Sequence, residues 1–156
     1  MRKKWVGAGL LGLLILGAGW LPARAGDSLY GKVTAVKSGD VVTFDYGQGT
    51  YEVRIIGIET EKGGPIAVQA GQLVRQMVLG KNARMRFEGL GEDGLMNARL
   101  FTDDPSLGIK EVAIELVRSG LARRQKGFDF KYGELTAAEN EARAARRGLW
   151  AAEQPR

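Results

Sequence analysis

Residues 52–64, EVRIIGIETEKGG, decide the fold, because they contain an apolar strand and the point at which it ends. Four of the first seven residues are the β-branched apolar type that a buried strand favours, namely Val53, Ile55, Ile56 and Ile58. Arg54 lies inside this run, and the run ends in Glu59-Thr60-Glu61 and then Lys62. We therefore expect a strand at residues 50–58 that places Arg54 next to a group of carboxylates.

Further strands are expected on both sides of this one. Segments rich in Val, Ile, Tyr, Phe and Thr predict five strands in all, at residues 29–37, 41–46, 50–58, 83–87 and 97–102. Turn residues separate the first three strands, at Ser38-Gly39-Asp40 and at Gly47-Gln48-Gly49. The last two strands are joined by a glycine-rich acidic turn. These lengths and spacings are typical of a small β-barrel.

Three helices follow the third strand. Residues 67–79 carry apolar side chains at the spacing of one helix face, at Ala70, Leu73, Val74, Met77 and Val78. Residues 109–119 and the alanine-rich residues 135–147 predict two more helices, and we expect Leu149-Trp150 to fold back onto the core. Five strands in a meander with helices added late predict an α+β fold, a five-stranded OB-fold β-barrel with three helices.

The N-terminus has the features of a secretory signal peptide. A basic start, Arg2-Lys3-Lys4, precedes an uncharged apolar stretch, and Ala23-Arg24-Ala25 has the form of a cleavage site. We expect a signal peptide at residues 1–25, a mature domain at residues 26–156, and export to the periplasm or the exterior, with no membrane span left after cleavage. The alternative is an uncleaved membrane anchor, although the apolar stretch is at the short limit for spanning a bilayer.

Charge and composition limit the chemistry. Four of the 23 basic residues and none of the 18 acidic residues lie in residues 1–25, so the mature chain is close to neutral. This balance argues against tight nucleic-acid binding of the sequence-independent kind. The chain has no cysteine and no histidine, which excludes disulfides, histidine metal ligands and a Ser-His-Asp triad. Hydrolysis would have to use carboxylates, arginine and water, with or without a hard cation.

Several motifs together resemble the staphylococcal nuclease-like (thermonuclease) family. VTAVKSGDVVTF, YEVRIIGIET, AGQLVRQMVLGK, AIELVRSGLA and AENEARAARRGLW occur in the order and spacing of that domain, over roughly residues 30–150. The resemblance implies the same OB barrel with three helices. It also implies the chemistry of active members, in which a calcium ion and arginines cleave DNA or RNA phosphodiesters.

The resemblance assigns roles to particular residues. Asp40 matches the first carboxylate that holds the cation, although the family pattern Asp-Gly-Asp-Thr reads Ser-Gly-Asp-Val here. Glu59 stands where the second cation carboxylate is an aspartate, and Thr60 matches a threonine whose carbonyl is a ligand. Arg54 matches the first arginine that binds the phosphate. Calcium binding through Glu59 needs an adjustment of the site, because glutamate is one methylene longer.

Two catalytic positions depart from the family. The Pro-Glu that follows the threonine reads Glu61-Lys62, so a lysine stands at the position of the general base. Glu61 can replace that base only if the loop shifts by one residue. Leu95 stands where the second phosphate arginine is expected, and Arg99 fits the ordinary strand after the turn. Arg54 and Glu61 therefore remain the candidate catalytic residues.

Several of these residues can instead have purely structural roles. Arg54 can form a structural ion pair with Glu59 or Asp40 at the rim of the barrel, and Asp40 can serve turn chemistry alone. Tyr132 and Phe128, before the last helix, can stack on a base or cover the core. We expect Phe87, Phe101 and Trp150 to be core residues.

The sequence therefore predicts an exported nuclease-like module that is non-catalytic and binds a partner protein or nucleic acid through its OB face. One alternative is a weakly active calcium-dependent endonuclease that cleaves DNA or RNA. A further alternative is an accessory or scaffold subunit of an envelope complex.

Overall fold

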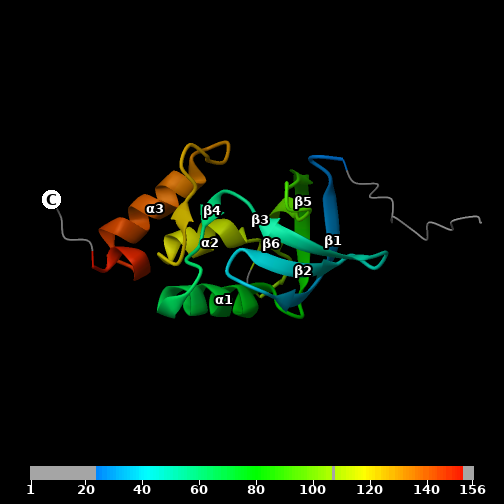
Figure 1. Ribbon diagram of the computed structural model, residues 1–156, viewed down its shortest axis with the longest axis horizontal. Coiled ribbons are helices and arrows are strands. Elements are labelled where there is room, and N and C mark those ends of the chain that lie inside the picture. Colours follow the sequence, from blue (N-terminus) through cyan, green and yellow to red (C-terminus); the bar gives the residue numbers. More distant parts are fainter. Residues whose placement is uncertain (1–23, 107, 153–156) are drawn as a thin grey trace, which may run out of the picture.

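A computed structural model describes residues 24–106 and 108–152 of the chain. Five strands form a closed barrel in the order β1-β2-β3-β6-β5. Their bounds are Ser28–Val36 (β1), Val41–Asp45 (β2), Thr50–Ile55 (β3), Asn82–Leu90 (β5) and Met96–Thr102 (β6). The helices are Gly64–Val78 (α1), Val112–Arg118 (α2) and Glu134–Ala144 (α3), followed by a 3-10 turn at Gly148–Trp150 (η1). The predicted five-stranded barrel with three helices is confirmed (Figure 1).

The register of the barrel places the loop between β5 and β6 beside the end of β3. β3 and β6 are parallel, with Arg54 opposite Asn97, whereas the other neighbouring pairs of barrel strands are antiparallel. Because the β5–β6 loop leads directly into β6, its residues lie close to Arg54. This arrangement determines which side chains can reach that arginine.

The third strand ends earlier than the predicted residues 50–58. β3 stops at Ile55, and Gly57 adopts a positive φ of 83°. A Cβ at Gly57 would lie 2.7 Å from the ring of Phe128, so only glycine fits this bend. The chain then enters a separate two-stranded sheet, in which Ile58–Glu59 (β4) pairs with Arg123–Arg124 (β7).

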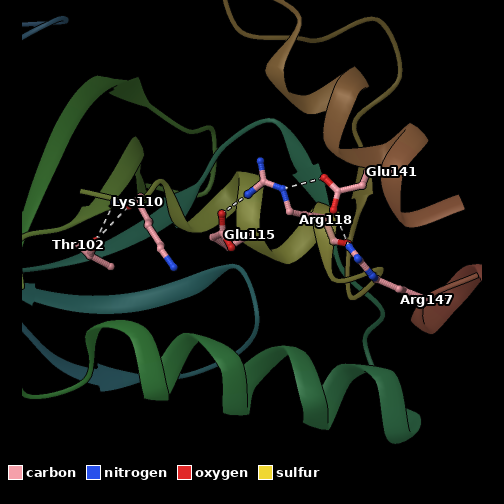
Figure 2. Close-up of polar contacts among 6 residues, drawn as sticks. All are labelled: Thr102, Lys110, Glu115, Arg118, Glu141 and Arg147. Atoms are coloured by element: carbon pink, nitrogen blue, oxygen red, sulfur yellow. Dashed lines mark hydrogen bonds and ion pairs between the residues drawn. The ribbon is translucent and has the colours of Figure 1, made fainter. Parts of the chain in front are cut away.

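Helix bounds also differ from the predicted ones. α1 begins at Gly64 instead of residue 67, because Pro65 suits the first turn of a helix, where its missing N–H leaves no bond unmade. α2 begins at Val112 instead of residue 109, and Lys110 is held by the side chain of Thr102 instead (Figure 2). α3 ends at Ala144, and Arg146, with a φ of 51°, has left the helix.

The C-terminal motif closes the fold through a contact between two glycines. A Cβ on Gly148 would lie 2.2 Å from the carbonyl oxygen of Gly120, and a Cβ on Gly120 would lie 2.2 Å from that of Arg147. The backbone N–H of Leu149 donates to the carbonyl of Gly120 at 2.9 Å. Trp150 is buried, as expected, with the guanidinium of Arg143 3.7 Å from its ring centroid.

Ion pairs hold α2, α3 and the C-terminal segment together (Figure 2). Arg118 of α2 contacts Glu115 on its own helix and donates to Glu141 of α3 at 3.1 Å. Arg147 donates to the same carboxylate at 2.8 Å, and these two arginines hold the pKa of Glu141 below its ordinary value. α3 and the C-terminal segment lie on the side of the molecule away from β1 (Figure 1).

Within the described residues, no helix has the length and apolar character needed to cross a membrane. Residues 1–23 of the predicted signal peptide, which spans residues 1–25, lie outside the described residues. Its cleavage, the export of the chain and the membrane-anchor alternative stay predictions.

Candidate functional site

A hollow of about 640 Å³ lies between the β1–β2 turn, the end of β3, the β4–α1 loop and α1. Five of the residues predicted from sequence line it, namely Asp40, Arg54, Thr60, Glu61 and Lys62. Residues from three separate segments of the chain thus meet at one end of the barrel, as the resemblance implies for a site.

The β1–β2 turn holds Asp40 in a defined position. The Ser38 hydroxyl donates to Asp40 Oδ1 at 2.7 Å, and the backbone N–H of Val41 donates to the same hydroxyl oxygen at 3.1 Å. The backbone N–H of Ile55 donates to the Asp40 carbonyl at 2.8 Å, which fixes the turn to the end of β3. The Asp40 carboxylate therefore both takes part in the hydrogen bonds of the turn and lines the hollow.

Arg54 forms an ion pair, but with neither of the expected partners. Its Nη1 lies 2.5 Å from Oδ2 of Asp93 in the β5–β6 loop, instead of pairing with Glu59 or Asp40. The register explains the difference, because the β5–β6 loop lies beside Arg54. The backbone N–H of Leu95 and the Arg54 guanidinium hold the pKa of Asp93 below its ordinary value.

The predicted cation ligands do not converge. Asp40 and Thr60 line the hollow, whereas Glu59 is exposed, pairs in β4 opposite Arg123 and does not line it. No group of three or more acidic residues among those described is arranged to hold a metal ion. Calcium favours six to eight oxygen ligands, and Lys62 adds a positive charge to this hollow. The residues present therefore do not fit the calcium ion that the family implies.

The β4–α1 loop brings two opposite charges to the hollow. Glu61 and Lys62 are both exposed, and neither forms an ion pair with another residue in the described part of the chain. Lys62 precedes Gly63, the N-cap of α1, which provides no side-chain cap, and the first helical turn carries no acidic residue. Lys62, which stands at the position of the family's general base, therefore adds a positive charge to the hollow.

Arg99 is committed elsewhere, as its predicted place in an ordinary strand suggests. It donates to both oxygens of Glu111, at 2.8 and 2.5 Å, and the ring of Phe130 covers its guanidinium at 3.9 Å. The hydrogen bonds that Arg99 donates to Glu111 raise the pKa of Arg99. Leu95 is half-buried at the end of the β5–β6 turn, and its side chain cannot bind a phosphate.

Tyr132 lies apart from this hollow. Its side chain is 79% exposed in the loop before α3, and it is not among the residues that line the site. Phe128 packs against the core and meets Phe130 edge to face. For Phe128 the core-covering alternative holds, and stacking by Tyr132 stays a prediction.

A second hollow of about 440 Å³ lies on the other side of Arg54. Asp93, Asn97 and Gln125 line it, and Arg54 lines both hollows. Sequence reasoning did not single out Asp93, because one aspartate in a glycine-rich turn is ordinary turn chemistry. The parallel pairing of β3 with β6 brings the loop that carries Asp93 beside Arg54.

Comparison with known proteins agrees with this fold. The family model described as staphylococcal nuclease homologue matches residues 52–152, which is more than half of the chain. No curated protein matches the chain. The matched region extends from β3, which carries Arg54, to the end of η1, which holds the Gly120–Gly148 contact. The chain therefore belongs to the staphylococcal nuclease homologue family.

Proposed function

We propose that this protein is a non-catalytic nuclease-like module that binds a nucleic-acid strand through the hollow beside Arg54. The observation that carries the proposal is the balance of charge in that hollow. Four cationic side chains line it, from Lys37, Arg54, Lys62 and Arg75, against the two carboxylates of Asp40 and Glu61. A phosphate is the group that such a surface favours.

Two of these cations are available to a ligand. Lys37 pairs with Glu52 and Arg54 with Asp93. Lys62 and Arg75 form no ion pair within the described residues, and Arg75 donates only to the carbonyl of Val36, at 3.3 Å. With Arg54, from which a phosphate would displace Asp93, three phosphate contacts predict weak binding, with a dissociation constant on the order of 10⁻⁵ M and a salt slope of about −2.1 for a single strand.

Loss of catalysis follows from the groups that replace the family residues. A positioned general base contributes about 10²–10⁴-fold to a rate, and one preorganised charge-stabilising donor about 10²–10³-fold. Lys62 stands at the base position and Leu95 at that of the second arginine. Of the two arginines of the family pattern, Arg54 remains.

A weakly active endonuclease is the second candidate, because of one observation. Glu61 lines the same hollow as Arg54 and Asp40, so one carboxylate of the loop is present to accept a proton from water. Binding of a partner protein and a role as accessory or scaffold subunit of an envelope complex have no such specific support, and both are outcomes of the test below.

The test measures binding and cleavage on the same purified protein. Binding of a labelled single strand of DNA or RNA is followed by fluorescence anisotropy over a salt series, for the wild type, Lys62→Ala and Arg54→Ala. We expect both variants to weaken binding and the Lys62 variant to reduce the salt slope by about 0.7. Gln72→Ala, an exposed change on α1 outside the hollow, is the matched control.

Cleavage is assayed with calcium and with EDTA. No product above the Arg54→Ala background is the expected result. Calcium-dependent cleavage that this variant abolishes would establish the endonuclease and refute the non-catalytic proposal. Absence of binding at low salt would refute nucleic acid as the ligand and leave a protein partner as the remaining alternative.

The predicted signal peptide supports a further part of the proposal, that this binding takes place outside the cytoplasm. Mass spectrometry of the protein from its native cells would show a chain that begins at residue 26. An intact N-terminus in the membrane fraction would establish the anchor instead.

A further inference from the structure

We infer that Asp93 is an internal competitor of the ligand, a carboxylate that occupies Arg54 until a phosphate displaces it. The inference rests on the proposed function and adds a regulatory contact to the same site. It names a residue that neither the motifs nor the family match identifies.

The geometry of the pair places Asp93 where a ligand phosphate would bind. Its Oδ2 lies 2.5 Å from Nη1 of Arg54, at the boundary between the two hollows that Arg54 lines. An oxyanion already occupies the guanidinium at hydrogen-bonding distance. A phosphate that binds Nη1 of Arg54 must take the place of this carboxylate.

Hydrogen bonds within the β5–β6 loop position Asp93 for this contact. Its Oδ1 accepts a hydrogen bond from the backbone N–H of Leu95 at 3.2 Å. The backbone N–H of Gly91 donates to the carbonyl of Leu95 at 2.8 Å, and Gly94 has a φ of 80° that closes the turn. A Cβ on Gly91 would lie 2.6 Å from Asp93 Oδ1, so the glycine leaves room for the carboxylate.

The pair is nevertheless open to exchange. The side chains of Arg54 and Asp93 are 39% and 43% exposed, and a single contact joins them. An exposed pair of this kind contributes little to stability. A phosphate can accept two parallel hydrogen bonds from a guanidinium and is the stronger partner.

The charge of the neighbouring Glu92 provides a matched control. Glu92 is exposed in the same turn and lines the second hollow, but it forms no ion pair within the described residues. Glu92→Gln and Asp93→Asn therefore remove the same charge from the same loop, and Asp93→Asn alone weakens the contact with Arg54.

The experiment measures the dissociation constant of a labelled single-stranded DNA at low salt for five proteins. These are the wild type, Asp93→Asn, Glu92→Gln, Arg54→Ala and the double variant Asp93→Asn with Arg54→Ala. We expect Asp93→Asn to bind about three- to fivefold more tightly, the range that an exposed ion pair permits. Glu92→Gln should change binding by less than about twofold, and the gain should vanish in the Arg54→Ala background.

Failure of the inference and failure of the proposed function give different results. Equal gains in the Asp93 and Glu92 variants, with Arg54 still required for binding, would overturn the competitor role and leave the proposed function intact. Equal binding by the wild type and Arg54→Ala would overturn the proposed function, and the inference with it. Circular dichroism of each variant confirms that it is folded.

Discussion

Two arginine–carboxylate pairs lie on neighbouring strands of the same barrel, and they differ in almost every physical respect. On β6, Arg99 binds both oxygens of Glu111, and their side chains are 20% and 4% exposed. On β3, Arg54 contacts one oxygen of Asp93, and their side chains are 39% and 43% exposed. The residue types are similar, but their environments are not.

The difference shows how burial separates a structural pair from an exchangeable one. Aromatic rings flank Arg99, with Phe130 at 3.9 Å and Phe101 at 5.4 Å from its guanidinium, so water has little access. Neither partner of such a pair can be removed without leaving a buried charge. Water can solvate Arg54 and Asp93 separately, so a ligand can separate them at low cost.

Removal of Glu111 gives the largest expected effect. Glu111→Ala leaves Arg99 without its partner in a mostly buried position, and we expect a loss of about 3–5 kcal/mol in the free energy of unfolding. Urea denaturation followed by tryptophan fluorescence measures it. Glu115→Ala, which removes the half-buried partner of Arg118, is the control, and it should cost less than about 1 kcal/mol. Equal losses in the two variants would show that the Arg99 pair has no special role.

Replacement of each arginine by lysine sharpens the comparison. Lysine keeps the charge but loses the planar fork that binds Glu111 and stacks on Phe130. We expect Arg99→Lys to lose about 1–2 kcal/mol of stability. Arg54→Lys should leave the denaturation midpoint unchanged, because one exposed contact is involved. A stability loss at position 54 that matched the loss at 99 would contradict our view of the Arg54 pair as exchangeable.

Sequence alone predicted the barrel and its helices because the relevant signals are local. Segments rich in Val, Ile, Tyr, Phe and Thr between turn residues indicated the strands, and the spacing of Ala70, Leu73, Val74 and Met77 indicated α1. In the AENEARAARRGLW motif, Leu149-Trp150 was predicted to fold back onto the core. The close contact between Gly120 and Gly148 explains how the chain does so. The bend at Gly57 was missed, because it depends on Phe128, which is distant in the chain.

The site was predictable only in part. Asp40, Arg54, Thr60, Glu61 and Lys62, which the family pattern picks out, line one hollow, and their roles there stay predictions. The family pattern placed Glu59 with them, but Glu59 does not line the hollow. It pairs opposite Arg123 in the small β4–β7 sheet, which the sequence did not predict. The partners of the two arginines were hidden for a similar reason, because Asp93 and Glu111 reach them through strand pairing and loop packing.

The two carboxylates should also titrate in opposite directions. Burial raises the pKa of Glu111 above its ordinary value despite the hydrogen bonds from Arg99, whereas the pKa of Asp93 is lowered. The stability linked to Glu111 is therefore present below the ordinary pKa of glutamate, about 4.3, and is lost as the pH rises through the raised value. The stability linked to Asp93 is present above the ordinary pKa of aspartate, about 3.9, and is lost as the pH falls through the lowered value.

Unfolding of Glu111→Gln and Asp93→Asn between about pH 3 and pH 7 tests these signs. The advantage of the wild type over the Gln variant should shrink as the pH rises. Its advantage over the Asn variant should shrink as the pH falls. A common direction for both variants would mean that the two carboxylates experience similar environments.

A small effect of the opposite sign, a gain in stability, is expected at Lys62. A lysine before the N-cap of α1 faces the positive end of the helix dipole, in a helix with no side-chain cap and no acidic residue in its first turn. Lys62→Glu should therefore stabilise the fold by about 0.3–1 kcal/mol, measured by urea denaturation with Gln69→Glu, an exposed position further along α1, as the control. A stabilised variant that no longer binds a nucleic-acid strand would show that folding does not require the lysine and that the ligand does. A destabilised variant would instead mean that Lys62 has a structural role, as Arg99 has, and that it resembles the exchangeable Arg54 less.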